Sequence, residues 1–316
     1  AIVGLRHLHP RLYMPHLRAC DDLQVVAALE KDASIRESFC REFGLKGYAD
    51  LVSLFSDSKP TIAAIFLPHD ECVEAALACA EKGIHVMVEK PVATSSDAVE
   101  TLAAVVASHQ VQFTTGYCWR MHPVAEECRR IIQTGILGTI VSGSGRCVAG
   151  RVDRYITGNA EWMLQRKHAG GGPLFNLGVH WIDLFRWLFT DEVVEVSGNN
   201  VKINKQYDIE DNSFAQLRFS RGAVVALDIS YTVPQSYPHG RDLFISVRGT
   251  QGCLSWAPAF EGEKDILEIC TDHPDFSGAP MRRIQFDLET VPGYAGIMGR
   301  KYILNFLRSV RQGTPP

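Results

Sequence analysis

The chain has 316 residues, enough to bury a large core, and this length favours two domains over one. Its formal net charge of −4 at pH 7 argues against a protein that binds nucleic acid or an anionic membrane surface. No apolar run approaches the length of a membrane span and no signal peptide precedes Ala1, so we expect no membrane partner.

Nine cysteines are scattered along the sequence without a Cys-x-x-Cys pair. Their odd number and irregular spacing favour reduced thiols over a disulfide framework or a zinc site, which predicts a cytoplasmic protein. His7 and His9 are one residue apart, but two histidines without a third ligand do not predict a metal site. We therefore expect no metal ion.

Short apolar runs alternate with amphipathic helical patterns over the first 118 residues. This alternation predicts a parallel, doubly wound α/β sheet, and we assign residues 1–118 to a Rossmann-like dinucleotide-binding domain. The expected strands lie at residues 1–4, 25–29, 61–67, 84–88 and 111–116.

A doubly wound sheet binds its ligand at the carboxyl ends of its strands. Glu30 closes the second strand, where a carboxylate accepts hydrogen bonds from the ribose hydroxyls of a nucleotide; a solvated glutamate is the alternative. The other strand ends that we expect to contact a cofactor carry Gly4, the run Leu67-Pro68-His69, and Glu89 with Lys90.

The glycine fingerprint of a dinucleotide site, Gly-x-Gly-x-x-Gly, is incomplete in this chain. A frame that starts at Gly4 has Arg6 and His9 where the second and third glycines belong. Their side chains should crowd the pyrophosphate, unless Arg6, His7 or His9 donates hydrogen bonds to it instead.

Lys90 follows the strand at 84–88 and precedes Pro91. A lysine at this place points into the ligand crevice, where burial and neighbouring charge tune the pKa of its ammonium group. A surface lysine in a proline-containing turn is the alternative.

From residue 119 onward the alternation ends and strands follow one another. Val225, Leu227 and Ile229 alternate with smaller or polar residues, the pattern of a sheet with one buried face. We predict an α+β domain at 119–316 with a large, mostly antiparallel open sheet. Because such a sheet often buries its second face in an oligomer, we expect a homodimer or homotetramer that assembles through it.

One helix of this second part carries the most informative pattern. It begins behind three glycines and Pro173, and Asn176, His180 and Asp183 form a polar stripe along it. An amide, an imidazole and a carboxylate in a row are typical of the wall of a site; a buried helix with a hydrogen-bonded histidine is the alternative.

Together these features resemble the Gfo/Idh/MocA oxidoreductases, which include glucose–fructose oxidoreductase and inositol dehydrogenase. The resemblance runs over nearly the full length. It is carried by Glu89-Lys90-Pro91, Tyr117, Arg120, Pro123, Gly135-x-x-Gly138, Gly170-Gly171-Gly172, Asn176, Gly178, His180, Asp183, Glu210-Asp211, Phe306, Gly313 and Pro315.

The resemblance implies a nicotinamide cofactor and the oxidation or reduction of a sugar-like hydroxyl or carbonyl. It also implies that Lys90 contacts the substrate oxygen and that His180 is the acid or base. Oxidising an alcohol needs a base near the hydroxyl, and a lysine stabilises the developing alkoxide charge. Asn176 replaces the aspartate that many members carry, so it can orient a hydroxyl but cannot accept a proton.

We predict a nicotinamide-dependent oxidoreductase that transfers hydride to or from a sugar, polyol or sugar derivative. NAD(H) is favoured over NADP(H), because Glu30 repels a 2′-phosphate, although Lys31 softens this preference. Two alternatives remain: an NAD-using epimerase or glycosidase with no net redox change, and a non-catalytic regulator that senses a sugar or NAD. The expected catalytic residues are Lys90, His180 and Asn176, and the expected substrate contacts are Tyr117, Arg120, Asn176 and Asp183.

Overall fold

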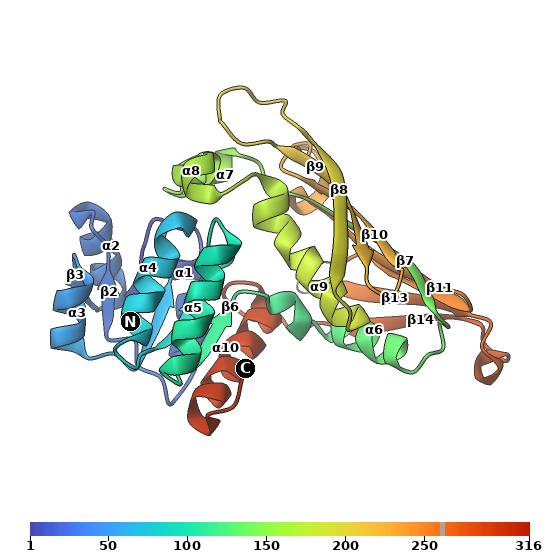
Figure 1. Ribbon diagram of the computed structural model, residues 1–316, viewed down its shortest axis with the longest axis horizontal. Coiled ribbons are helices and arrows are strands. Elements are labelled where there is room, and N and C mark those ends of the chain that lie inside the picture. Colours follow the sequence, from blue (N-terminus) through green and yellow to red (C-terminus); the bar gives the residue numbers. More distant parts are fainter. Residues whose placement is uncertain (260–262) are drawn as a thin grey trace.

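The structure, a computed structural model, describes residues 1–259 and 263–316. It consists of two parts, each built on one sheet (Figure 1). The N-terminal part holds a six-stranded sheet and the C-terminal part an eight-stranded sheet. This architecture confirms the predicted fold class.

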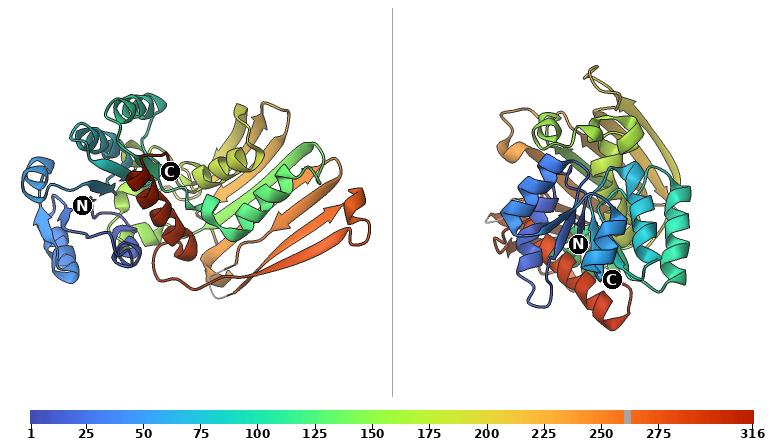
Figure 2. Two further views of the ribbon diagram at one scale, coloured as in Figure 1. Left: turned by 90° about the horizontal axis from the view of Figure 1, so that it is seen from below. Right: turned by 90° about the vertical axis from the view of Figure 1, so that its left-hand side faces the viewer.

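The N-terminal sheet is parallel throughout, with the order β3-β2-β1-β4-β5-β6. Helices cover both of its faces (Figure 2), which explains why its central strands are apolar on both sides. The strands are β1 (Ile2–Val3), β2 (Ala27–Leu29), β3 (Lys46–Tyr48), β4 (Ile62–Ile65), β5 (His85–Val88) and β6 (Phe113–Thr115). The helices are α1 (Pro10–Arg18), α2 (Ala33–Phe43), α3 (Leu51–Ser58), α4 (His69–Ala80) and α5 (Ser96–Ser108).

The last helix, α10 (Gly296–Gln312), returns to the N-terminal part. Its residues Tyr302, Ile303 and Phe306 share one buried cluster with Tyr13 and Met14 of α1. The helix α10 thus contributes to the core of the first part, although it follows the second sheet in sequence. The division of the chain at residue 118 remains a prediction.

The C-terminal sheet has the order β14-β13-β12-β11-β7-β10-β9-β8, and its pairs are antiparallel except for β7 with β10. The strands are β7 (Ile140–Ala149), β8 (Val193–Val201), β9 (Asn212–Phe219), β10 (Val224–Ser230), β11 (Arg241–Gly249), β12 (Gly252–Trp256), β13 (Lys264–Thr271) and β14 (Met281–Asp287). Before and between them lie η1 (Cys118–Met121), α6 (Pro123–Gln133), α7 (Asp153–Thr157), η2 (Glu161–Leu164), α8 (Arg166–Ala169), η3 (Leu174–Gly178), α9 (Val179–Phe189), η4 (Pro238–Gly240) and η5 (Pro274–Phe276).

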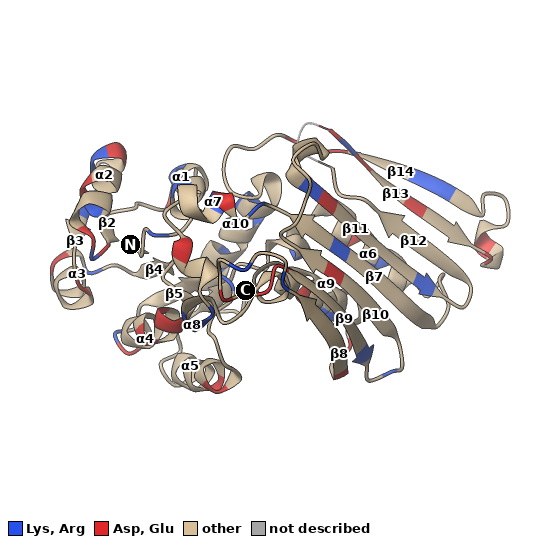
Figure 3. Cartoon of the chain, turned by 90° about the horizontal axis from the view of Figure 1, so that it is seen from above, with Lys and Arg blue, Asp and Glu red and all other residues tan. Residues whose placement is uncertain are grey.

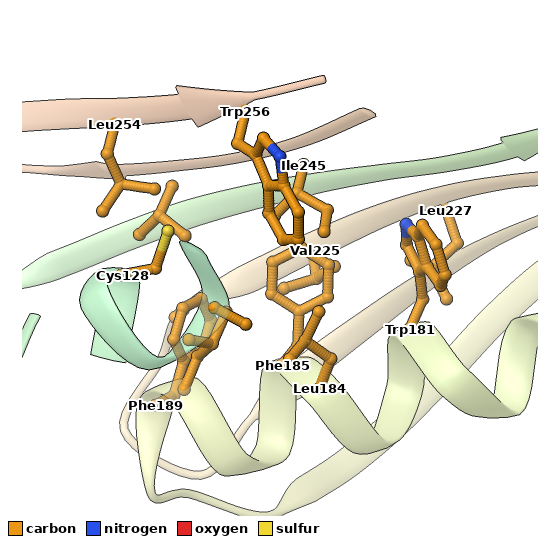
Figure 4. Close-up of a cluster of buried hydrophobic side chains, with 14 of the residues drawn as sticks. Cys128, Trp181, Leu184, Phe185, Phe189, Val225, Leu227, Ile245, Leu254 and Trp256 are labelled. Atoms are coloured by element: carbon orange, nitrogen blue, oxygen red, sulfur yellow. The ribbon is translucent and has the colours of Figure 1, made fainter. Parts of the chain in front are cut away.

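Helices α6 and α9 pack on one face of this sheet. Trp181 and Phe185 of α9 lie against the strands in a large apolar cluster (Figure 4). Two glycines of β7 make room for these rings: a Cβ atom at Gly145 would lie 2.2 Å from Cδ1 of Trp181, and one at Gly143 would lie 2.7 Å from Cε1 of Phe185. This close packing fixes α9, and with it His180, relative to the sheet.

The opposite face of the same sheet carries exposed apolar side chains. Phe214 of β9 is 46 % exposed and Val224 of β10 is 36 % exposed. Apolar side chains gathered on an exposed sheet are typical of an interface between subunits. Assembly of a homodimer or homotetramer through this face remains a prediction.

Lysine and arginine residues are interspersed with aspartate and glutamate over both parts of the chain (Figure 3). This mixed pattern gives no support to a nucleic-acid partner. Within the described ranges, none of the helices combines the length and the apolar character needed to cross a membrane.

The packing of α9 gives a first prediction. Gly145→Ala should lower the free energy of unfolding by about 1–3 kcal/mol, because the new methyl group must displace Trp181. Gly278→Ala is the matched control, since Gly278 is exposed and a Cβ atom there meets nothing within 4 Å. Urea unfolding measures both variants, and equal midpoints would contradict this account of the packing.

Candidate active site

Lys90 and Asn176 join the two parts of the chain. Lys90 follows β5, is buried, and precedes Pro91 through a cis peptide bond. Its Nζ atom donates to the backbone oxygen of Asn176 at 2.9 Å and to Oδ1 of the same residue at 2.7 Å. Burial lowers the pKa of the Lys90 ammonium group, and the charge of Arg154 adds to this, whereas Glu89 opposes it. The predicted catalytic lysine therefore touches the predicted catalytic amide.

Asn176 lies in η3, a π-helical turn that leads directly into α9. The entry to this turn requires Gly172, because a Cβ atom there would lie 2.2 Å from the backbone oxygen of Glu210. The Gly172 N–H donates to Oε1 of Glu210 at 3.0 Å. The glycine run thus lets the turn approach Glu210 closely, and this contact fixes the position of Asn176.

Two tyrosines complete the surroundings of Asn176. Its Nδ2 atom donates to the hydroxyl of Tyr155 at 2.8 Å and to that of Tyr231 at 2.9 Å. With Lys90 on Oδ1, the buried amide is therefore bonded at both ends, and its orientation is fixed. Neither tyrosine was predicted from the sequence to be part of the site.

His180 lies one helical turn after Asn176 and is buried. Its Nδ1 atom is buried without a hydrogen-bond partner among the described residues, and its ring centroid is 6.3 Å from that of Tyr117. Burial, followed by the positive charge of Lys90, lowers the pKa of His180 well below its usual value. Both effects favour the neutral imidazole, which has one unprotonated ring nitrogen that can accept a proton.

Arg120 and Asp183 bind each other. Nε of Arg120 donates to Oδ2 of Asp183 at 2.8 Å, and a second, shorter bond joins Nη2 to Oδ1. Burial raises the pKa of the Asp183 carboxyl group, and Arg120 opposes this. The pair ties η1 to α9 on the side of the site near Tyr117 and His180, so both expected substrate contacts already have a protein partner.

The loop after β1 departs from the glycine fingerprint in a specific way. Gly4 has a φ of +88°, and a Cβ atom there would lie 2.9 Å from the backbone of Leu67. His9, in place of the third glycine, bonds Oε2 of Glu89 through Nδ1 at 2.9 Å. His9 thus stands where the third glycine is expected and links this loop to the strand end that carries Lys90.

Two buried imidazoles near this loop each leave Nε2 without a hydrogen-bond partner in the described structure. Nδ1 of His7 accepts from the backbone N–H of His9 at 3.0 Å, so neutral His7 carries its proton on Nε2. Nδ1 of His69 bonds the backbone oxygen of Ala169 at 2.8 Å, so neutral His69 carries its proton there and leaves Nε2 as an acceptor. One free donor and one free acceptor therefore lie at the carboxyl ends of β1 and β4.

Glu30 is buried at the end of β2. Oε2 of Glu30 accepts from the N–H of Leu5 at 2.9 Å, and Oε1 accepts from the N–H of Asp32 at 3.1 Å. A carboxylate oxygen can accept more than one hydrogen bond, so these contacts fix the position of the Glu30 carboxylate and leave it able to accept further hydrogen bonds. Arg6 is exposed in the same loop.

The segment that contains η2 covers this loop. The indole N–H of Trp162 donates to the backbone oxygen of Arg6 at 2.5 Å. The Trp162 ring also lies edge-on to His69, with 4.8 Å between the ring centroids. The second part of the chain therefore closes over the strand ends of the first.

The described residues contain no group of three or more His, Cys, Asp or Glu side chains arranged to hold a metal ion. All nine cysteines lie in the described ranges and are free thiols.

Comparison with known proteins assigns the family. The model of the oxidoreductase family with an NAD-binding Rossmann fold matches residues 1–117, and that of the GFO/IDH/MocA C-terminal domain matches residues 125–255. The chain belongs to the Gfo/Idh/MocA oxidoreductase family. This confirms the resemblance that the sequence motifs carried.

Two curated relatives illustrate the family. A provisionally named UDP-kanosamine synthase oxidoreductase subunit of Amycolatopsis mediterranei is 31 % identical over 60 % of this chain and 51 % of its own length. Levoglucosan dehydrogenase of Pseudarthrobacter phenanthrenivorans is 23 % identical over 71 % of this chain and 63 % of its own length. The matches thus span less than two thirds of these relatives.

Solved structures share the complete fold. An oxidoreductase domain protein from Kribbella flavida has a TM-score of 0.83 at 20 % identity, covering 100 % of this chain and 90 % of its own. GenD2, solved with NAD, has a TM-score of 0.81 at 21 % identity, and the match covers 100 % of this chain and 86 % of the GenD2 chain. KijD10, a 3-ketoreductase from Actinomadura kijaniata solved with NADP, has a TM-score of 0.79 at 20 % identity. The match covers 100 % of this chain and 90 % of the KijD10 chain.

The buried histidines of this Gfo/Idh/MocA protein predict that acid destabilises it. Burial lowers the pKa of His69 to about 4, and it lowers those of His7, His9 and His180 well below their usual values. The unfolded chain binds protons at these residues below about pH 6.5, whereas the folded protein does not. The free energy of unfolding should therefore fall as the pH drops from about 6.5 to 4, by about 3 kcal/mol for His69 alone.

Urea unfolding of wild type and His69→Asn between pH 7 and 4 measures this effect. The variant should show a shallower loss of stability than wild type, whereas His109→Asn, at an exposed histidine, should match wild type. If the free energy of unfolding of His69→Asn fell with pH as steeply as that of wild type, His69 would titrate alike in the folded and unfolded chains, which would contradict the prediction.

Proposed function

We propose that this protein is an NAD(P)-dependent oxidoreductase that transfers hydride to or from a sugar, polyol or sugar derivative. The observation that carries the proposal is the buried contact between Lys90 and Asn176, one helical turn from the neutral His180. The names of relatives such as levoglucosan dehydrogenase support a sugar-like substrate.

The strand ends suit a dinucleotide. Neutral His7 offers an Nε2–H donor for a pyrophosphate oxygen, and neutral His69 offers an Nε2 acceptor for a ribose hydroxyl. Glu30, at the end of β2, would accept from the adenosine ribose. Arg6 and Leu67-Pro68 complete the set of residues that would hold the cofactor. When bound, the nicotinamide supplies or accepts the hydride.

The chain's own residues would move the proton. In the oxidation direction the neutral imidazole of His180 takes the proton of the substrate hydroxyl on its unprotonated ring nitrogen. Lys90 stabilises the negative charge that develops on that oxygen, and the water-excluding surroundings strengthen this interaction. Asn176 holds the Lys90 ammonium in place through its two oxygens.

Removal of the proposed base gives a direct test. His180→Gln should lower kcat by about 100-fold or more while leaving NADH affinity within about twofold, because general base catalysis contributes on that order. His109→Gln is the control at an exposed position. Formation of NADH from NAD⁺ over a panel of polyols and sugars measures turnover; full activity in His180→Gln would overturn the assignment.

The same panel separates the alternatives. An epimerase or glycosidase would convert its sugar with bound NAD but release no NADH, and chromatography of the sugar detects it. A sensor would bind NADH and the sugar without converting either.

Glu30 should make the protein select NAD(H), because a carboxylate at this place repels the 2′-phosphate of NADPH. Titration of the tryptophan fluorescence should show tighter binding of NADH than of NADPH. Glu30→Ser should reduce the ratio of NADH affinity to NADPH affinity by about tenfold or more, since a charged contact contributes roughly 1.5–3 kcal/mol to binding. Equal affinities in wild type would contradict this preference.

A further inference from the structure

Arg154 lies in α7, on the segment that follows β7. Three contacts hold its guanidinium group. A Cβ atom at Gly150 would lie 2.3 Å from Cζ of Arg154, so the guanidinium packs directly on this glycine. Cζ also lies 4.7 Å from the ring centroid of Tyr155, and Nη2 donates to the Tyr155 hydroxyl at 2.6 Å.

Among the described residues this fixed cation lacks an anionic partner. Nε of Arg154 is buried without a hydrogen bond, and within residues 1–259 and 263–316 no carboxylate forms an ion pair with this arginine. A guanidinium carries five N–H donors and a permanent charge, and its burial is costly unless the charge is paired. The arrangement is therefore that of an arginine able to bind an anion that the described part of the chain does not supply.

Arg154 is connected to the centre of the proposed reaction. The Tyr155 hydroxyl that accepts from Arg154 also accepts from Nδ2 of Asn176, whose Oδ1 accepts from Lys90. The positive charge of Arg154 also lowers the pKa of Lys90, after the larger effect of burial. A group bound by Arg154 would thus lie on the same substrate whose oxygen Lys90 contacts.

A second arginine adds positive charge at this place. Arg241 begins β11 and pairs with Ala149, the residue before Gly150. Burial lowers the pKa of Arg241, and the positive charge of Arg154 lowers it further. Like charges held this close together repel each other, and a bound anion would relieve that repulsion.

The nearby buried carboxylate is already committed. Oε2 of Glu89 bonds Nδ1 of His9 at 2.9 Å, and Oε1 of Glu89 accepts from the N–H of Lys90 at 3.1 Å. Glu89 therefore offsets part of the charge around Lys90 and, in the described part of the chain, forms no ion pair with Arg154.

We propose that Arg154, supported by Arg241, binds an anionic group on the substrate, so that the preferred sugar is a carboxylated or phosphorylated one. This inference rests on the proposed function, because it assigns a substrate to the same site. Arginine suits this role, since its planar fork binds carboxylate and phosphate oxygens in pairs.

Calorimetric titration of the NADH-loaded protein tests the inference with D-glucuronate, D-glucose 6-phosphate and D-glucose. At least one anionic sugar should bind about tenfold or more tightly than glucose. Arg154→Gln should weaken that binding by about 10- to 100-fold and weaken the binding of glucose much less. Arg154→Lys should recover part of the loss, and Arg151→Gln, an exposed arginine of the same segment, should behave as wild type.

A preference for glucuronate alone identifies a carboxylate as the ligand, and one for glucose 6-phosphate alone identifies a phosphate. The absence of any preference over glucose, or an equal loss for charged and neutral sugars in Arg154→Gln, overturns the inference. NADH titration before sugar is added separates this result from failure of the proposed function. Protein that binds NADH but shows no charge preference refutes only the anionic substrate, whereas protein that does not bind NADH refutes both.

Discussion

The structure depends on the burial of one ammonium group. A buried lysine is costly unless hydrogen bonds compensate for lost water, and Lys90 obtains two of them from a single residue of the other part of the chain. The strand end and the turn before α9 must therefore stay in register for Lys90 to remain satisfied. Asn176 is in turn held by Tyr155 and Tyr231, so the contact extends to the segment around α7 and to the end of β10.

The same burial sets the chemistry of the neighbours. Lys90 favours the neutral form of His180, because a second positive charge close by would be repelled in surroundings that exclude water. An ammonium group next to a neutral imidazole suits the oxidation of an alcohol, because the ammonium stabilises the alkoxide and the imidazole accepts the hydroxyl proton. The two roles thus follow from one arrangement, in which the lysine is bonded and the histidine leaves Nδ1 unbonded.

Much of this was predictable from the sequence, for physical reasons. Apolar runs that end in polar residues identified the strand ends, so Glu30, Lys90 and His69 were placed at one edge of a sheet. The strand β3 was missed because it has three residues, two of them exposed. Arg154 and Tyr155 were missed because they lie in a five-residue helix without an apolar period. Tyr231 continues the alternation of Val225, Leu227 and Ile229 at its buried end, and this position was a usable signal. The free nitrogens of His7 and His69 depend on partners such as Ala169, 100 residues away, which no local pattern reveals.

A double-mutant cycle on turnover tests most directly whether Lys90 and Asn176 act as one unit. Lys90→Met, Asn176→Ala and the double variant would be compared with wild type in single-turnover formation of NADH, with urea unfolding confirming that each is folded. The account predicts that the double variant loses no more activity than the worse single variant, because either change dismantles the same contact. Losses that multiply would show that the two residues act independently and would contradict it.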